Sequence, residues 1–308
     1  MKRLVLTIAI IFSLSHTIWA EGNPSNTGNV RYVKAPRFVR PLVERWIAEY
    51  AKKESGVVFK IAKGSTDQAQ INLNIVLGNQ TYHTNSISPV FYFGEFAILP
   101  ITASGSEAAK VLDGKRLNAK KLKQLYFNES EDEENKRTKE YEKLVIYSGS
   151  NATSVATTFA HRFGEESTNF RGKRISGDDF FLNTALSKDP LGVAFNSLPN
   201  IYDLESRHSK NNLTLIGLDI KKGSEANLSD QTTLDELITI LENNNISEIA
   251  IEKIGLIYNE PDDITNKFIK WILTDGTQYN HQYGLLNLDN KQIASQIDKV
   301  SSTLTAQK

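Results

Sequence analysis

The sequence contains no cysteine and carries no net charge. The lack of cysteine excludes disulfides, cysteine metal sites, thiol catalysis and lipid attachment through an N-terminal cysteine. Basic and acidic residues both number 36, so the basic excess of a nucleic-acid or membrane-surface binder is missing. The Walker, GxGxxG, HExxH and GxSxG motifs are absent too. We therefore expect a globular protein with no nucleic-acid partner, no metal and no cofactor.

The N-terminus has the layout of a secretory signal peptide. Lys2 and Arg3 form a basic start, residues 4–14 are apolar, and Ala20 provides a small residue before a cleavage point. An uncleaved membrane anchor is the alternative, but the apolar run is shorter than the ~18 residues that a span needs. We predict a signal peptide over residues 1–20 and an exported protein that is soluble after cleavage. In a Gram-negative bacterium this compartment is the periplasm.

Hydrophobic periodicity alternates between strand and helix along the mature chain. Period-two or continuous apolar runs predict strands, and stripes at three- and four-residue spacing predict helices. This alternation predicts an α/β fold with mostly parallel sheets flanked by helices. The strands are predicted at 30–33, 57–61, 71–77, 92–101, 145–147, 193–195, 213–218 and 249–258, and the helices at 36–53, 117–126, 155–163, 180–186, 233–241, 265–283 and 290–304.

The stretch 145–163 combines a strand, a turn of small polar residues and a helix. The start of a helix carries unpaired N–H donors and about half a positive charge, so such a turn can hold an anion. Hydroxyl groups of the turn add further donors: Ser148, Ser150, Thr153 and Ser154. The alternative is that Ser150 or Asn151 simply caps a helix that packs on the core.

Five segments, taken in order, resemble a known family. They are Phe38 to Tyr50 (FVRPLVERWIAEY), Lys63 to Ala69 (KGSTDQA), Leu117 to Phe127 (LNAKKLKQLYF), Leu191 to Phe195 (LGVAF), and Phe268 to Gly276 (FIKWILTDG) with Tyr283 to Leu288 (YGLLNL). Together these segments resemble the phosphate-binding proteins of ABC importers, which belong to the type II periplasmic-binding-protein superfamily. The resemblance extends over nearly all of the mature chain.

The resemblance implies two α/β lobes joined by two crossover strands, with an oxyanion held between the lobes by helix N-termini and hydroxyls. It places the first lobe at residues 21–102 plus 219–308 and the second at 103–218, with crossings near 101–102 and 218–219. It also implies phosphate or another small oxyanion as ligand and a monomeric state. The membrane component of an ABC importer, or another envelope protein, would be the partner.

Carried over residue by residue, the resemblance implies a ligand-binding set that departs from the family pattern. The family's ligand turn has an Arg and an Asp before a Ser-Gly-Thr, whereas residues 147–153 contain neither. Pro36 lies where the family offers a hydroxyl at the start of the first helix, and it lacks an N–H. Arg37 is the expected replacement for the missing cation. The predicted ligand-binding residues are Arg37, Ser65, Thr66, Ser148, Gly149, Ser150, Asn151 and Thr153.

Three functions follow from these features. The first is an exported receptor for phosphate or a related oxyanion that serves an ABC importer. The second is a binding-fold protein that has lost its small ligand and acts as a partner-binding envelope component, which the missing Arg and Asp favour. The third, an enzyme, is not expected, because the histidines have no recognisable spacing to a nucleophile or metal partner.

Overall fold

The computed structural model describes residues 30–78, 89–128, 138–151, 153–220, 228–260 and 262–305. The predicted signal peptide, residues 1–20, lies outside the described residues. Across the described ranges, none of the helices combines the length and the apolar character that crossing a bilayer requires.

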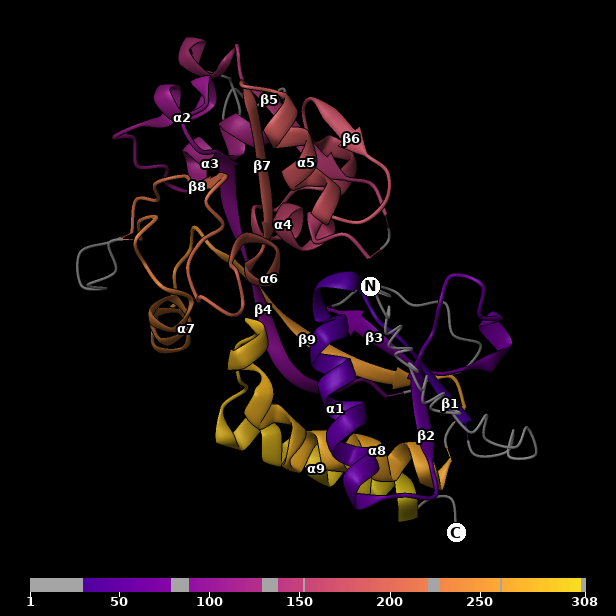
Figure 1. The fold of residues 1–308 in the computed structure, drawn as a ribbon. Helices are drawn as coiled ribbons and strands as arrows, with labels where there is room; N and C mark the ends of the chain where they lie inside the picture. The colour runs from indigo at the N-terminus through magenta and orange to yellow at the C-terminus, as the bar shows by residue number, and fades with distance from the viewer. Residues whose placement is uncertain are drawn as a thin grey trace, which may run out of the picture.

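The first lobe is built on a β-α-β unit at the start of the described chain. β1 (Val30–Lys34) pairs in parallel with β2 (Val58–Ile61), as the sequence predicts, and also with β3 (Ile71–Leu77). α1 (Arg40–Lys53) connects β1 to β2 and packs its apolar stripe, which includes Trp46 and Tyr50, into the core. α8 (Asp263–Thr274) and α9 (Asn290–Thr305) complete this lobe (Figure 1).

Two long antiparallel strands connect the lobes. β4 (Phe91–Ala103) pairs with β9 (Ala250–Tyr258) along its first half, and β9 also pairs with β3 of the first lobe. The second half of β4 pairs with β7 (Gly192–Ser197) and β8 (Leu213–Leu215) of the second lobe. β4 therefore runs through both halves of the molecule (Figure 1).

The second lobe surrounds β5 (Val145–Gly149), which lies in parallel between β7 and β6 (Lys173–Ile175). An aromatic cluster forms its core, and the rings of Phe159 and Phe195 stack with centroids 4.2 Å apart. The helices of this lobe are α2 (Glu107–Leu112), α3 (Ala119–Tyr126), α4 (Ala156–Arg162) and α5 (Phe180–Lys188). Two more, α6 (Leu198–Ile201) and α7 (Leu234–Asn243), lie near the junction of the lobes (Figure 1).

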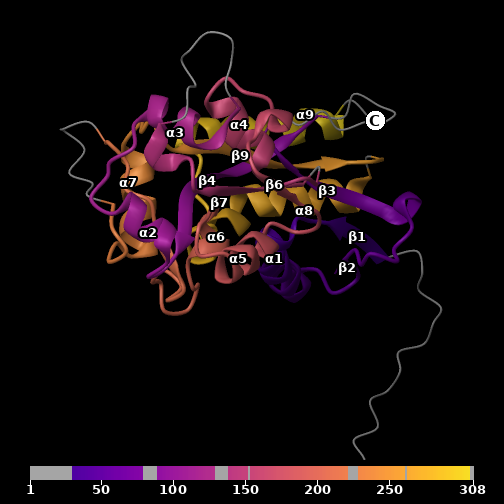
Figure 2. The same cartoon turned by 90° about the horizontal axis from the view of Figure 1, so that it is seen from above.

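Helices lie on both sides of the central strands. Seen from above, α3, α4 and α9 lie on one side of β4 and β9, and α1, α5 and α6 lie on the other (Figure 2). This arrangement agrees with the predicted α/β, two-lobed fold, and it buries the central strands on both faces.

The structure corrects the predicted sheet and two element boundaries, and it adds the helix α2. Four of the eight strand pairings among the described residues are parallel and four are antiparallel, because the crossover strands run against their neighbours. The predicted strand 213–218 ends at Leu215, and α2 was not predicted. The helix predicted over 265–283 ends at Thr274, and Trp46 donates its indole N–H to the carbonyl of Gly276 at 2.9 Å just beyond that end.

The division of the chain into lobes at residues 102 and 218 stays a prediction. Leu218 forms a bridge with Leu117 at the entrance to α3. The long strand that runs back into the first lobe is β9, which begins later in the chain at Ala250.

Candidate functional site

The turn between β5 and α4 is closely packed at its start. Ser148 is fully buried, and its hydroxyl has no hydrogen-bond partner among the described residues. Gly149 follows, and a Cβ at this position would lie 2.2 Å from Ser154 Oγ and 2.3 Å from Asp179 Oδ1. Only glycine fits here without displacing those groups.

An anion from the chain itself lies at the start of α4. Asp179, which precedes α5, accepts a hydrogen bond from Ser154 Oγ at 2.7 Å and one from the backbone N–H of Val155 at 2.8 Å. Its side chain is buried, with 6% of the residue exposed. A carboxylate at a helix N-terminus balances the positive end of the helix dipole. Asp179 therefore fills the place that the sequence assigns to an external anion.

The ionisation of Asp179 reflects this buried position. Burial raises the pKa of Asp179 to about 6, while the hydrogen bonds from Ser154 and Val155 act to lower the pKa and the neighbouring Asp178 raises it. At neutral pH most molecules thus carry a negative charge at the start of α4.

Three polar residues of the turn are exposed, and the side chains of two of them are hydrogen-bonded. Ser150 donates its hydroxyl to the carbonyl of Ile175 at 3.2 Å, and Asn151 Oδ1 accepts the backbone N–H of Gly177 at 3.4 Å. Neither side chain caps α4, so the alternative that one of them is its N-cap is wrong. Thr153 is exposed and makes no side-chain hydrogen bond within the described part of the chain.

Arg37 belongs to the first lobe and lies near this turn. It begins the short 3-10 helix Arg37–Val39, which links β1 to α1, and its side chain is exposed. Its guanidinium carbon lies 4.9 Å from the centroid of the Phe180 ring. Phe180 is the first residue of α5 and follows Asp179 directly. The predicted cation of the first lobe therefore contacts the second lobe beside the turn.

Ser65 and Thr66 lie in a turn after β2. Thr66 Oγ1 accepts the backbone N–H of Lys63 at 2.9 Å. Both residues line a 730 Å³ groove beside α1, together with Glu44 and Ile47. No hydrogen bond of the described residues connects Ser65 or Thr66 to the turn at 148–153.

The sequence predicts a helix over 180–186 that has Asp178 as its cap and carries its apolar side chains to the core, but Phe180 and Phe181 are exposed. The role of Asp179 was not predicted. The residue at the N-cap of α5 is Asp179, and Asp178 Oδ1 accepts the backbone N–H of Phe180 at 2.9 Å. Asp179 interacts with residues far away in the sequence, so no local spacing pointed to its role.

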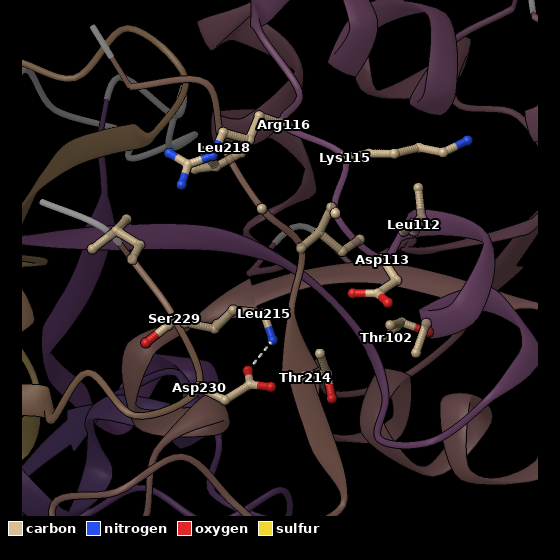
Figure 3. A pocket seen from close by; sticks show the side chains of 15 residues that line it. Thr102, Leu112, Asp113, Lys115, Arg116, Thr214, Leu215, Leu218, Ser229 and Asp230 are labelled. Carbon is tan, nitrogen blue, oxygen red and sulfur yellow. Dashed lines mark hydrogen bonds between the residues drawn. The ribbon is translucent and has the colours of Figure 1, made fainter. Parts of the chain in front are cut away.

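Another cavity, of 320 Å³, lies on a different part of the second lobe (Figure 3). It is bounded by β8, Asp230 and the link between α2 and α3, and it contains none of the predicted ligand-binding residues. Asp230 already accepts the backbone N–H of Leu215 at 2.8 Å, and Lys115 pairs with Glu140. These groups serve the local structure.

The sequence matches no model of a known protein family, and it matches no curated protein. Solved structures are similar in fold. A putative phosphate ABC transporter substrate-binding protein from Clostridium perfringens, solved with bound phosphate, is 11% identical with a TM-score of 0.59, over 85% of this chain and 100% of that chain. An ABC-type phosphate transport receptor from Vibrio cholerae is 10% identical with a TM-score of 0.54, over 84% of this chain and 100% of that chain. The chain therefore has the fold of phosphate-type substrate-binding proteins of ABC transporters.

Proposed function

We propose that the chain is an exported binding protein that holds a small anionic ligand, phosphate or a related oxyanion, between its lobes. The observation that carries this proposal is the contact of Arg37 with Phe180, because it places a cation of the first lobe beside the turn of the second. The fold that the chain shares with phosphate receptors supports the same location.

Arg37 has the chemistry that an oxyanion requires. Within the described part of the chain, its guanidinium makes no hydrogen bond or ion pair. A guanidinium offers five N–H donors in a planar arrangement that matches phosphate and carboxylate oxygens. Asn151 and Thr153 are exposed on the turn and complete the proposed site.

The remaining predicted contacts have smaller roles in this proposal. Ser148 is buried, Gly149 is packed against Asp179, and the Ser150 hydroxyl is engaged with Ile175. Ser65 and Thr66 belong to the rim near α1. In a Gram-negative cell the receptor would act in the periplasm and deliver its ligand to the membrane component of an ABC importer.

The position of Asp179 favours a second candidate function. Its carboxylate uses the Ser154 hydroxyl and the Val155 N–H, which are donors that an oxyanion at the start of α4 would need. A second anion at the same place would be repelled. A binding fold closed in this way would serve as a partner-binding envelope component without a small ligand.

Calorimetric titration of the mature chain, residues 21–308, separates the two candidates. The protein is unfolded and refolded first, which removes any ligand carried over from the cells, and is then titrated with phosphate, sulfate and molybdate. Binding in the micromolar range, weakened by Thr153→Trp, supports the receptor. If phosphate, sulfate and molybdate all fail to bind to the folded, stripped protein, a receptor for these inorganic anions is contradicted, and the partner-binding function is left unless an organic anion binds instead.

A further inference from the structure

Two adjacent phenylalanines are exposed at the start of α5. Phe180 is 39% exposed and Phe181 is 45% exposed, and Val58 is the other large apolar residue of the described chain with a comparable exposure. Keeping a large apolar side chain in water forgoes the free energy that its burial would provide. Neighbouring exposed aromatics therefore indicate a surface that becomes covered when something binds.

The two rings are held in place by the structure around them. Gly177 has φ of +104°, and a Cβ at this residue would lie 2.9 Å from the Phe181 ring, so the ring packs directly on the glycine backbone. Phe180 lies under the guanidinium of Arg37.

α5 itself is anchored by other residues. Leu182 and Leu186 are buried on its inner side. Asn196 donates to the carbonyl of Asp179 at 2.9 Å and to Asn183 Oδ1 at 3.1 Å, which ties the start of the helix to β7. Because these contacts hold the helix, Phe180 and Phe181 are not needed to attach it to the lobe.

Arg37 lies over the Phe180 ring, and Phe181 is exposed at the next position of α5. The Asp179 carboxylate occupies the donors at the start of α4 and would repel a second anionic group there, whereas Arg37 is an exposed cation. An inorganic oxyanion would satisfy Arg37 but would leave both rings in water. A ligand with a flat apolar body joined to its anionic group would cover both.

We propose that the ligand is an organic anion, with its phosphate ester or carboxylate on Arg37 and its planar ring against Phe180 and Phe181. This inference rests on the proposed receptor function and specifies the class of ligand. Asn151 and Thr153, exposed on the neighbouring turn, provide hydrogen-bonding groups at the anionic end.

The test compares matched probes on the refolded mature chain by calorimetric titration. Phenyl phosphate and methyl phosphate differ only in the apolar body, and benzoate and acetate form the same pair for carboxylates. Inorganic phosphate is the reference. We expect the aromatic member of at least one pair to bind roughly tenfold tighter than its partner and than inorganic phosphate, as burial of aromatic surface requires. The pair that shows the difference identifies the anionic group.

Single substitutions test whether the two phenylalanines cause the preference for the aromatic probe. Phe181→Ala should remove most of the tenfold preference, and Phe180→Ala should reduce the preference as well. Val58→Ala, which truncates the other exposed apolar residue on edge strand β2, should leave it unchanged. Circular dichroism confirms that the variants fold, which we expect since both rings are exposed.

The outcomes separate this inference from the proposed function. If inorganic phosphate binds and neither aromatic probe binds tighter, the organic-anion inference is overturned while the receptor function stands. A preference that survives both phenylalanine substitutions also overturns it, because the ring then lies elsewhere. If no probe binds, inorganic phosphate included, the receptor function fails and the inference fails with it.

Discussion

Asp179 Oδ2 accepts the backbone N–H of Val155 at 2.8 Å, although the two residues precede different helices of the second lobe, α5 and α4. This bond joins the β6–α5 connection to the start of α4. It supplies α4 with an internal anion, and Arg37 is an exposed cation on the surface beside it.

The stability of the protein should depend on the protonation of Asp179. Its folded pKa of about 6 lies above the usual value of 3.8, so the folded chain holds this proton more tightly than the unfolded chain. The stability from the protonated carboxyl is complete below about pH 4 and is lost as the pH rises through about 6. Between pH 4 and 7, the free energy of unfolding of the wild type should fall by up to about 3 kcal/mol relative to that of Asp179→Asn.

Urea denaturation of both proteins at several pH values measures this difference. The comparison with Asp179→Asn matters because other carboxylates, such as Asp262 and Asp235, have lowered pKa values and produce the opposite trend in both proteins. A difference that stays constant from pH 4 to 7 would contradict the buried, ionisable state of Asp179.

Substitution of Gly149 by alanine should destabilise the turn. The added Cβ would lie 2.2 Å from Ser154 Oγ and 2.3 Å from Asp179 Oδ1, so these groups or the backbone must move. We expect a loss of roughly 1–3 kcal/mol in the free energy of unfolding. Gly64→Ala is the matched control, since nothing lies within 4 Å of a Cβ there and its effect should be small. Equal effects of the two substitutions would argue against the described packing of the turn.

Replacing Ser148 by alanine should stabilise the protein. Its hydroxyl is buried without a described partner, and burying an unpaired polar group costs about 1–3 kcal/mol. Part of this cost should be recovered, which would appear as a higher urea midpoint with an unchanged slope. Ser150→Ala, which removes an exposed hydroxyl, should change the midpoint little. A lower midpoint for Ser148→Ala would show that the hydroxyl has a partner in solution.

Much of the fold could be predicted from the sequence because its signals are local. Alternation of Ile71, Leu73 and Ile75 indicated β3, and the apolar stripe around Trp46 indicated α1. Asp178 was predicted to cap α5 from its position before an apolar helix, and its carboxylate accepts the N–H of that helix's first residue. The antiparallel strand pairings were not predicted, because an alternation of strands and helices does not show which strands a crossover strand pairs with.

The site was only partly predictable for a related reason. Arg37 was identified as a candidate cation, and the structure places it against the second lobe. The contact of Asp179 with Val155 spans 24 residues of sequence and depends on β5 and β6 lying side by side. Exposure of Phe180 and Phe181 was equally hidden, since helix periodicity alone assigned α5 side chains to the core.

The most direct test of the account is the effect of Arg37 on anion binding. Phosphate and phenyl phosphate are titrated into the refolded wild type, into Arg37→Gln, and into Lys267→Gln, which removes an exposed cation of α8. Loss of a charge-assisted contact should weaken binding to Arg37→Gln by about tenfold or more, while Lys267→Gln should bind like the wild type. Wild-type affinity in Arg37→Gln would contradict a ligand held between the lobes by this residue.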